Sequence, residues 1–186
     1  MRNPRVFFKK AAKFGERDAK MKVSRQVMHY RHGDKMEIGW KEWCALPDIH
    51  IPAVKAKIDT GAKTSSLHAY NIEPFYLHHQ LWVKFDLHPI QRDNKFSVHR
   101  TAPVIDQRFV TSSTGHKELR YVIKTHIQLG LDEWEIELTL TNRERMMFRM
   151  LLGRDAIADH AVIDASHAHR QFRLTNRQAK KLFKEL

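Results

Sequence analysis

The chain has little cysteine, glycine or proline and no long apolar run. Cys44 is the only cysteine among 186 residues, so no disulfide can form within the chain. A single thiol suits a reducing compartment, and we expect a cytoplasmic protein. No stretch of about eighteen apolar residues occurs, so the sequence predicts no membrane-spanning helix and no membrane partner. The basic N-terminus lacks the apolar segment of a secretory signal.

Two motifs of metal and nucleotide chemistry are also missing. The sequence contains no His-Glu-x-x-His pair for zinc and no Gly-x-x-x-x-Gly-Lys-Ser/Thr loop for ATP phosphates. Histidines are frequent, and His78-His79 and His167-x-His169 have ligand-like spacing, but neither pair has a clear third ligand. We therefore expect no metal and no other cofactor.

Positive charge is concentrated at the two ends of the chain. The net charge is +12, and residues 1–36 contain 11 Lys and Arg against 3 Asp and Glu. Residues 167–186 contain 6 against 1, whereas residues 37–166 contain 16 against 17 and are nearly neutral. Basic ends on a neutral body favour docking to an anionic partner such as RNA, a ribosome or an acidic protein. The alternative is that the tails are solvated and aid solubility, because no RNA-binding signature with interleaved aromatic residues is present.

Two-residue alternation of apolar and polar side chains predicts a protein made mostly of strands. The alternation is strictest over residues 134–140, and short runs of the same kind recur between turn signals. The length fits one domain. The expected strands cover residues 38–46, 54–58, 64–69, 75–87, 101–110, 120–129, 134–140, 148–152 and 162–164, with a short helix over 156–161. The pattern indicates an all-β barrel or sandwich.

One stretch carries the chemistry. Val54, Ala56 and Ile58 alternate with two lysines, and the strand they predict ends at Asp59-Thr60-Gly61. Glycine permits a sharp turn there, and an aspartate fixed by such a turn is a candidate acid or base. The alternative is that Asp59 only caps a turn in a binding domain.

A second block follows about ninety residues later, with the sequence Met150-Leu-Leu-Gly-Arg-Asp155. The pair Ile-Asp-Thr-Gly-Ala and Leu-Leu-Gly-Arg-Asp resembles the retroviral-type aspartic peptidases, the retropepsins. With Glu-Leu-Thr-Leu-Thr-Asn-Arg between them, the blocks resemble a bacterial family that carries the name ATP-dependent zinc protease, from about Ile38 to Leu174. The resemblance implies a single-lobed retropepsin-like barrel over 37–174 with one short helix. It leaves a basic N-terminal arm, 1–36, and a helix-compatible basic C-terminal tail, 175–186.

The resemblance also implies a reaction and its residues. Retropepsins are homodimers in which one aspartate from each subunit forms a pair that shares a proton, since two like charges this close cannot both ionise. Asp59, Thr60 and Gly61 would be catalytic, with Thr60 hydrogen-bonding across the twofold axis. The hairpin over residues 101–129 would cover the substrate. The substrate-binding residues implied are Ala62, Lys63, Ser113, Gly115 and Arg154.

The sequence departs from the viral pattern at Lys63, where viral enzymes usually have an acid that pairs with the arginine of the second block. Lys63 and Arg154 would make the cleft basic and favour acidic or glutamate-extended substrates. The alternative places Lys63 in solvent and pairs Arg154 with Asp155 or Asp164. The leading interpretation is an aspartic endopeptidase acting as a homodimer. A non-catalytic retropepsin-fold module that docks to a ribosome or RNA is the other candidate.

Overall fold

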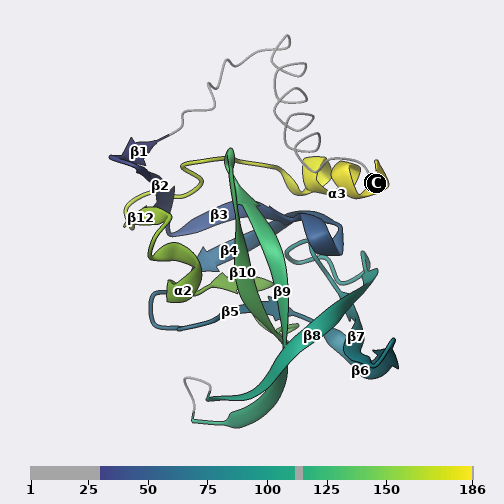
Figure 1. The fold of residues 1–186 in the computed structure, drawn as a ribbon. Helices are drawn as coiled ribbons and strands as arrows, with labels where there is room; N and C mark the ends of the chain where they lie inside the picture. Colours follow the sequence, from purple (N-terminus) through teal and green to yellow (C-terminus); the bar gives the residue numbers. More distant parts are fainter. Residues whose placement is uncertain (1–29, 112–114, 186) are drawn as a thin grey trace.

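The computed structural model describes residues 30–111 and 115–185 (Figure 1). Strands account for most of them, as the alternation predicts, so the all-β class is confirmed. The strands are β1 Arg31–His32, β2 Lys35–Gly39, β3 Lys41–Leu46, β4 Ile51–Ile58, β5 Ser65–His68, β6 Tyr70–Leu77, β7 Gln80–Leu87, β8 Val98–Thr111, β9 Lys117–Leu129, β10 Asp132–Thr141, β11 Met150–Leu152 and β12 Ala161–Asp164. The helices are η1 Pro47–Ile49, α2 Arg154–Ile157 and α3 Asn176–Lys184.

Six strands close into a barrel. The strand order is β10-β5-β11-β4-β3-β9, and β9 pairs back with β10, so the ring has no free edge there. β8, β7 and β6 continue from β9 as an extension of the same sheet, as Figure 1 shows. The parallel pairs β4–β11 and β5–β10 bring together segments that are far apart in the sequence. The short helix α2 follows β11 directly, as expected for the second block.

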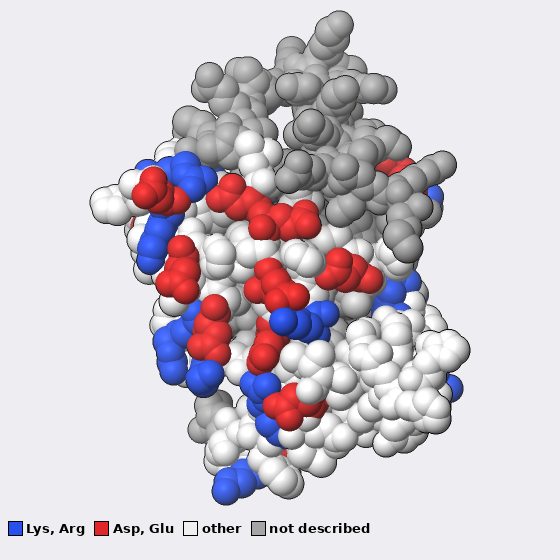
Figure 2. All heavy atoms as spheres, viewed as in Figure 1, with Lys and Arg blue, Asp and Glu red and all other residues white. Residues whose placement is uncertain are grey.

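The alternation in β10 shows why these residues form this barrel. Trp134, Ile136 and Leu138 are buried, whereas the glutamates between them face outward. Over this part of the surface Figure 2 shows acidic and basic side chains interspersed. Two ion pairs account for part of that pattern, Lys124 with Glu135 and Arg108 with Glu137. Burial of the apolar side contributes roughly 25 cal/mol for each Å² removed from water.

The strand predicted over residues 75–87 is wrong as one element. The chain reverses at His78-His79 and forms the hairpin β6–β7, with Leu77 opposite Gln80. Both histidines have left-handed backbone angles, φ 49° and 63°. Sequence reasoning missed the turn because histidine is not a usual turn residue and the apolar alternation continues on both sides of it.

Structure extends beyond both ends of the expected 37–174 domain. β1 and β2 form a small sheet with β12, in which Met36 is buried opposite Ala161. At the other end, Thr175 and Gln178 form a capping box at the start of α3. Ala179 and Leu182 of α3 pack in a cluster with Trp43 of β3. In the described part of the chain, no helix is long and apolar enough to cross a membrane.

Candidate active site

Asp59 lies at the end of β4, where the barrel fixes its backbone. β4 pairs in parallel with β11, with Ile58 opposite Leu152, and the Asp59 N–H donates to the Leu152 carbonyl at 2.9 Å. The side chain then closes the turn, because the Gly61 N–H donates to Asp59 Oδ1 at 3.1 Å. The carboxylate is thus oriented by backbone groups rather than by a flexible loop.

Gly153 makes the two sequence blocks one structural unit. A Cβ on this residue would lie 2.7 Å from the Lys63 carbonyl oxygen, so no larger residue fits without movement of the backbone. The Gly153 N–H donates to Ser65 Oγ at 3.0 Å, and the next N–H, of Arg154, donates to the Ala62 carbonyl at 2.9 Å. The segment after Asp59 and the segment after β11 therefore hold each other in place.

The Arg154 guanidinium supports the aspartate turn from the outside. Its Nη1 donates to the carbonyl oxygens of Thr60 and Gly61, at 2.7 and 3.1 Å. The alternative in which Arg154 pairs with Asp155 or Asp164 is wrong. The geometry makes Arg154 a positioning residue for the turn that carries Asp59.

Lys63 is paired rather than free. Its Nζ lies 2.8 Å from Asp155 Oδ2, and the two side chains are 73% and 53% exposed. An exposed pair of this kind contributes about 0–1 kcal/mol, because water screens it on all sides. The acid that viral enzymes usually have at the position of Lys63 is replaced by a lysine, and here Asp155 supplies the opposite charge.

The exposure of the Asp-Thr-Gly turn bears on how a second carboxylate could be supplied. Asp59 is half-buried, and Thr60 and Gly61 are exposed. The sequence contains no second Asp-Thr-Gly and no Asp-Ser-Gly. An outward-facing turn of this kind can meet the same turn of a second copy about a twofold axis.

Arg143 is a site residue that the sequence reasoning did not assign. Burial and the neighbouring Arg120 guanidinium lower the pKa of Arg143, and the nearby Asp59 carboxylate opposes this effect. Arg120 in turn bonds to Glu118, which also accepts a hydrogen bond from the Thr141 hydroxyl. Arg143 is the last residue of the Glu-Leu-Thr-Leu-Thr-Asn-Arg block, and that was the available signal.

A chain of polar side chains, which runs from the buried His68 and His88 to the exposed Ser97, anchors Arg143 from behind. Its backbone N–H donates to His68 Nδ1 at 3.0 Å, so the His68 proton lies on Nε2, which is 3.5 Å from His88 Nδ1. His88 Nε2 then bonds to the Tyr70 hydroxyl at 3.1 Å, and Tyr70 bonds to Ser97 Oγ at 2.7 Å. Burial and nearby cations lower the pKa of His68 to about 4, so this ring is neutral near pH 7.

The histidine pairs with ligand-like spacing do not come together. His78 and His79 form the β6–β7 turn, and His167 bonds to Asp164 at 2.6 Å. Burial and neighbouring lysines lower the pKa of His169 to about 4. Within residues 30–111 and 115–185, no three His, Cys, Asp or Glu side chains are grouped so that they could hold a metal ion. Cys44 is fully buried, and burial raises the pKa of its thiol.

The hairpin of β8 and β9 extends away from the barrel, as Figure 1 shows. Gly115 lies close to its tip with φ 82° and open space around it, and Ser113 lies outside the described residues. Phe109 and Leu119 face each other across the two strands and are 72% and 52% exposed. The hairpin therefore presents a pair of apolar side chains to solvent.

Comparison of the sequence and the structure with known proteins shows which proteins this chain is similar to. The sequence profile of the RimB-like family, described as "Retropepsin-like aspartic endopeptidase RimB", matches residues 37–174. Proteins named "Probable alpha-L-glutamate ligase" are similar over 135 residues: 50% identical in Shewanella pealeana and 47% in Parasynechococcus marenigrum, covering 73% of this chain. The matched segment is only 30% and 29% of those two proteins.

Among solved structures, the chain is similar to Lpg0085 of Legionella pneumophila, a protein of unknown function. The sequence identity is 29% and the TM-score is 0.59, over 72% of this chain and 95% of that one. The barrel described above is thus a fold that another bacterial chain also adopts over almost its whole length.

Proposed function

The chain belongs to the RimB-like family of retropepsin-like aspartic endopeptidases, and on that premise we propose that it hydrolyses amide bonds in polypeptides as a homodimer. Each protomer contributes Asp59 to one shared catalytic pair. The fold class and the Asp-Thr-Gly turn agree with this proposal. The observation that carries it is the double anchoring of the Asp59 turn, by β11 and by Arg154, on an outward-facing edge.

The reaction follows from two carboxylates that share one proton. The ionised carboxylate takes a proton from water as the water attacks the peptide carbonyl, and the protonated partner donates to the carbonyl oxygen. Because the two groups interact strongly, the pH profile belongs to the pair and not to either residue. Thr60 bonds across the axis, and Gly61 keeps Asp59 Oδ1 oriented through its N–H.

The substrate we propose is an acidic or glutamate-extended polypeptide. Arg143 places a cation close enough to Asp59 for their charges to interact. It joins the residues that the sequence predicts to bind substrate, which are Ala62, Lys63, Ser113, Gly115 and Arg154. The relatives named as glutamate ligases support this substrate class, because a segment like this one shares a chain with an activity named for glutamate.

A second candidate function is a non-catalytic module that docks to a ribosome or RNA through its basic ends. The charge distribution favours docking, with nine Lys and Arg against two Asp and Glu in residues 1–29. Docking and hydrolysis are separable, since the first depends on the ends of the chain and the second on Asp59.

The test is peptide hydrolysis by the parent chain and by Asp59→Asn. We expect the parent to cleave glutamate-rich peptides and Asp59→Asn to be inactive, with an unchanged melting temperature, because an amide cannot share the proton of the pair. Equal turnover by the two chains would disprove the catalytic role of Asp59. An inactive parent that still binds RNA or ribosomes would favour the docking module.

A further inference from the structure

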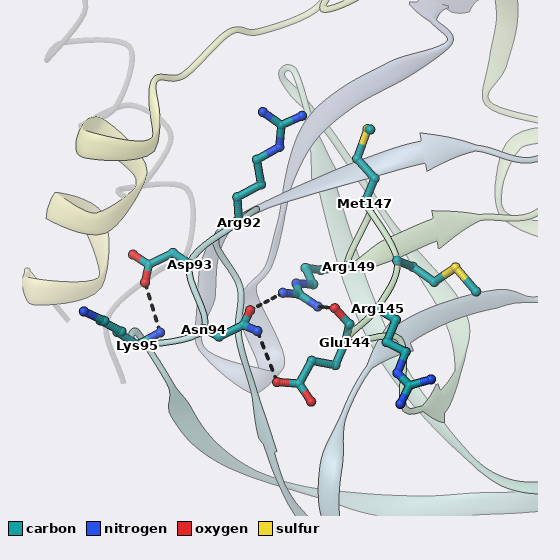
Figure 3. Close-up of a pocket in the computed structure, with 9 residues that line it drawn as sticks. Arg92, Asp93, Asn94, Lys95, Glu144, Arg145, Met147 and Arg149 are labelled. Atoms are coloured by element: carbon teal, nitrogen blue, oxygen red, sulfur yellow. Dashed lines mark hydrogen bonds between the residues drawn. The ribbon is translucent and has the colours of Figure 1, made fainter.

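A pocket lies on the surface outside the Asp59 turn, and none of its residues belongs to that turn. It is a pocket of about 570 Å³ between the loop after β7 and the loop that joins β10 to β11 (Figure 3). Gln91 ties the two loops together, donating to the Met147 carbonyl at 2.7 Å. The pocket is lined by Arg92, Asp93, Asn94, Lys95, Glu144, Arg145, Met146, Met147 and Arg149.

Arg149 is the buried residue of this pocket. Only 3% of it is exposed, and its guanidinium donates to the Glu144 carbonyl at 2.7 Å and to Asn94 Oδ1. Its Nε is buried and has no hydrogen-bond partner in the described residues. A buried donor without a partner is costly, and a guanidinium is a planar donor suited to carboxylate and phosphate oxygens.

The other cations of the pocket are uncompensated. Arg92, Lys95 and Arg145 make no ion pair with any carboxylate in the part of the chain that the structure describes. Figure 3 shows Arg92 and Arg145 on opposite loops, on either side of Arg149, with their side chains extended away from it toward the rim of the pocket.

The two acids do not cancel this charge. Asp93 is occupied, because it pairs with Lys180 of α3 and accepts the Lys95 backbone N–H at 3.1 Å. Glu144 is the acid that remains, and Asn94 Nδ2 donates to it at 3.2 Å. Four cations therefore line the pocket, with Glu144 as the one acid that is not in an ion pair with a lysine.

We propose that this pocket is an oxyanion-binding site, which takes a carboxylate or phosphate group between Arg92, Arg145 and the buried Arg149. Charge-assisted hydrogen bonds from several guanidinium groups at one site favour a multivalent oxyanion over chloride. The negative charge of Glu144, which acts on Arg149, opposes binding of the ligand. The oxyanion is either a side chain of an acidic peptide or a free anion such as inorganic phosphate.

The experiment measures binding of inorganic phosphate and of tri-glutamate to the full chain by calorimetry at low salt. Arg145→Gln removes an exposed cation of the pocket, and Lys124→Gln removes an exposed cation of β9 with the same change in net charge. Glu144→Gln removes the negative charge that opposes binding. Variants at Arg149 are avoided, since its guanidinium also supports the backbone of the loop.

We expect Arg145→Gln to weaken binding about tenfold, as for one charge-assisted hydrogen bond. Glu144→Gln should tighten binding several-fold, and Lys124→Gln should leave it unchanged. If tri-glutamate binds more tightly than phosphate and phosphate displaces it, the natural ligand is a side chain of an acidic peptide. If phosphate binds more tightly, the natural ligand is a free anion. Failure of both probes to bind, equal weakening by Arg145→Gln and Lys124→Gln, or weakening by Glu144→Gln would each overturn the proposal.

Discussion

At the scale of single residues, two arginines, Arg154 and Arg143, surround the Asp59 turn. The sequence marks Arg154 through its place after Gly153 and predicts that it binds substrate, with Asp155 or Asp164 as the alternative partner. The structure instead gives it two carbonyl oxygens of the Asp59 turn. Arg143 lies at the end of a recognisable block, yet its proximity to Asp59 depends on the pairing of β10 with β5, which no local pattern encodes.

Arg154→Leu tests the positioning role. We expect kcat to fall up to about a hundredfold, because small displacements of a catalytic group are that costly. Arg154→Lys should not restore it, since an ammonium is not the planar fork of donors that a guanidinium presents. Steady-state kinetics and thermal unfolding of both variants check this. Full activity in Arg154→Leu would show that the turn holds Asp59 without help.

Arg143→Gln tests how the acidic substrate is recognised. Loss of one charged contact is worth about 1.5–3 kcal/mol, so the preference for acidic over neutral peptides should fall at least tenfold. Lys63→Gln is the matched comparison and should change the preference less, because Asp155 already neutralises Lys63. The measurement is kcat/KM for paired peptides. A larger loss of preference in Lys63→Gln than in Arg143→Gln would show that Lys63 is the main residue that recognises acidic peptides.

At the scale of elements, the sequence predicts most of the strands but only some of the turns between them. Strict alternation predicts β10, and the turn before it contains Gly130 with φ 62°. The β6–β7 turn contains no glycine, so no local pattern marks it. The hairpin β8–β9 was expected, but the exposed pair at Phe109 and Leu119 depends on a register that only the structure reveals.

The exposed pair on the β8–β9 hairpin should contact substrate. Phe109→Ser is expected to raise KM for peptides roughly tenfold, as burial of one aromatic side chain on the substrate is lost. The free energy of unfolding should change by less than about 0.5 kcal/mol, because the residue is exposed. Tyr76→Ser on β6, a side chain of similar exposure, is the control. An unchanged KM for Phe109→Ser would show that this part of the hairpin does not contact the substrate.

Glu42 joins β3 to the C-terminal segment and makes stability depend on pH. It is fully buried and accepts N–H groups of Gly39 and Arg170, both at 2.7 Å. Burial raises its pKa from 4.5 to about 7. As pH rises, Glu42 therefore ionises in the unfolded chain before it ionises in the folded one. The free energy of unfolding falls between pH 4.5 and 7 for this reason.

The free energy of unfolding lost through Glu42 is roughly 3 kcal/mol for a pKa shift of this size. Glu42→Gln cannot ionise, so its unfolding free energy should lack this decline. Urea unfolding of both chains at pH 4.5, 5.5, 6.5 and 7.5 measures the difference. Parallel pH profiles for the parent and the variant would contradict the assignment.

At the scale of the whole molecule, the proposal assigns docking to the basic ends of the chain and hydrolysis to the barrel. Deletion of residues 1–29, which leaves β1 and β2 intact, should weaken binding to RNA or ribosomes and flatten its salt dependence. It should leave peptide selectivity unchanged, since charges outside the cleft act through long-range attraction. Filter binding at several salt concentrations and kcat/KM for acidic and neutral peptides measure the two effects. A change in selectivity without a change in salt dependence would contradict this division.

The central claim is that one active site needs Asp59 from two copies of the chain. Parent and Asp59→Asn chains are co-refolded in equal amounts, and peptide hydrolysis is compared with that of the parent at the same total concentration. Random pairing leaves the parent pair in about a quarter of the dimers, so we predict activity near a quarter of the parent value. Activity near one half would mean that each protomer works alone, and would contradict the shared pair.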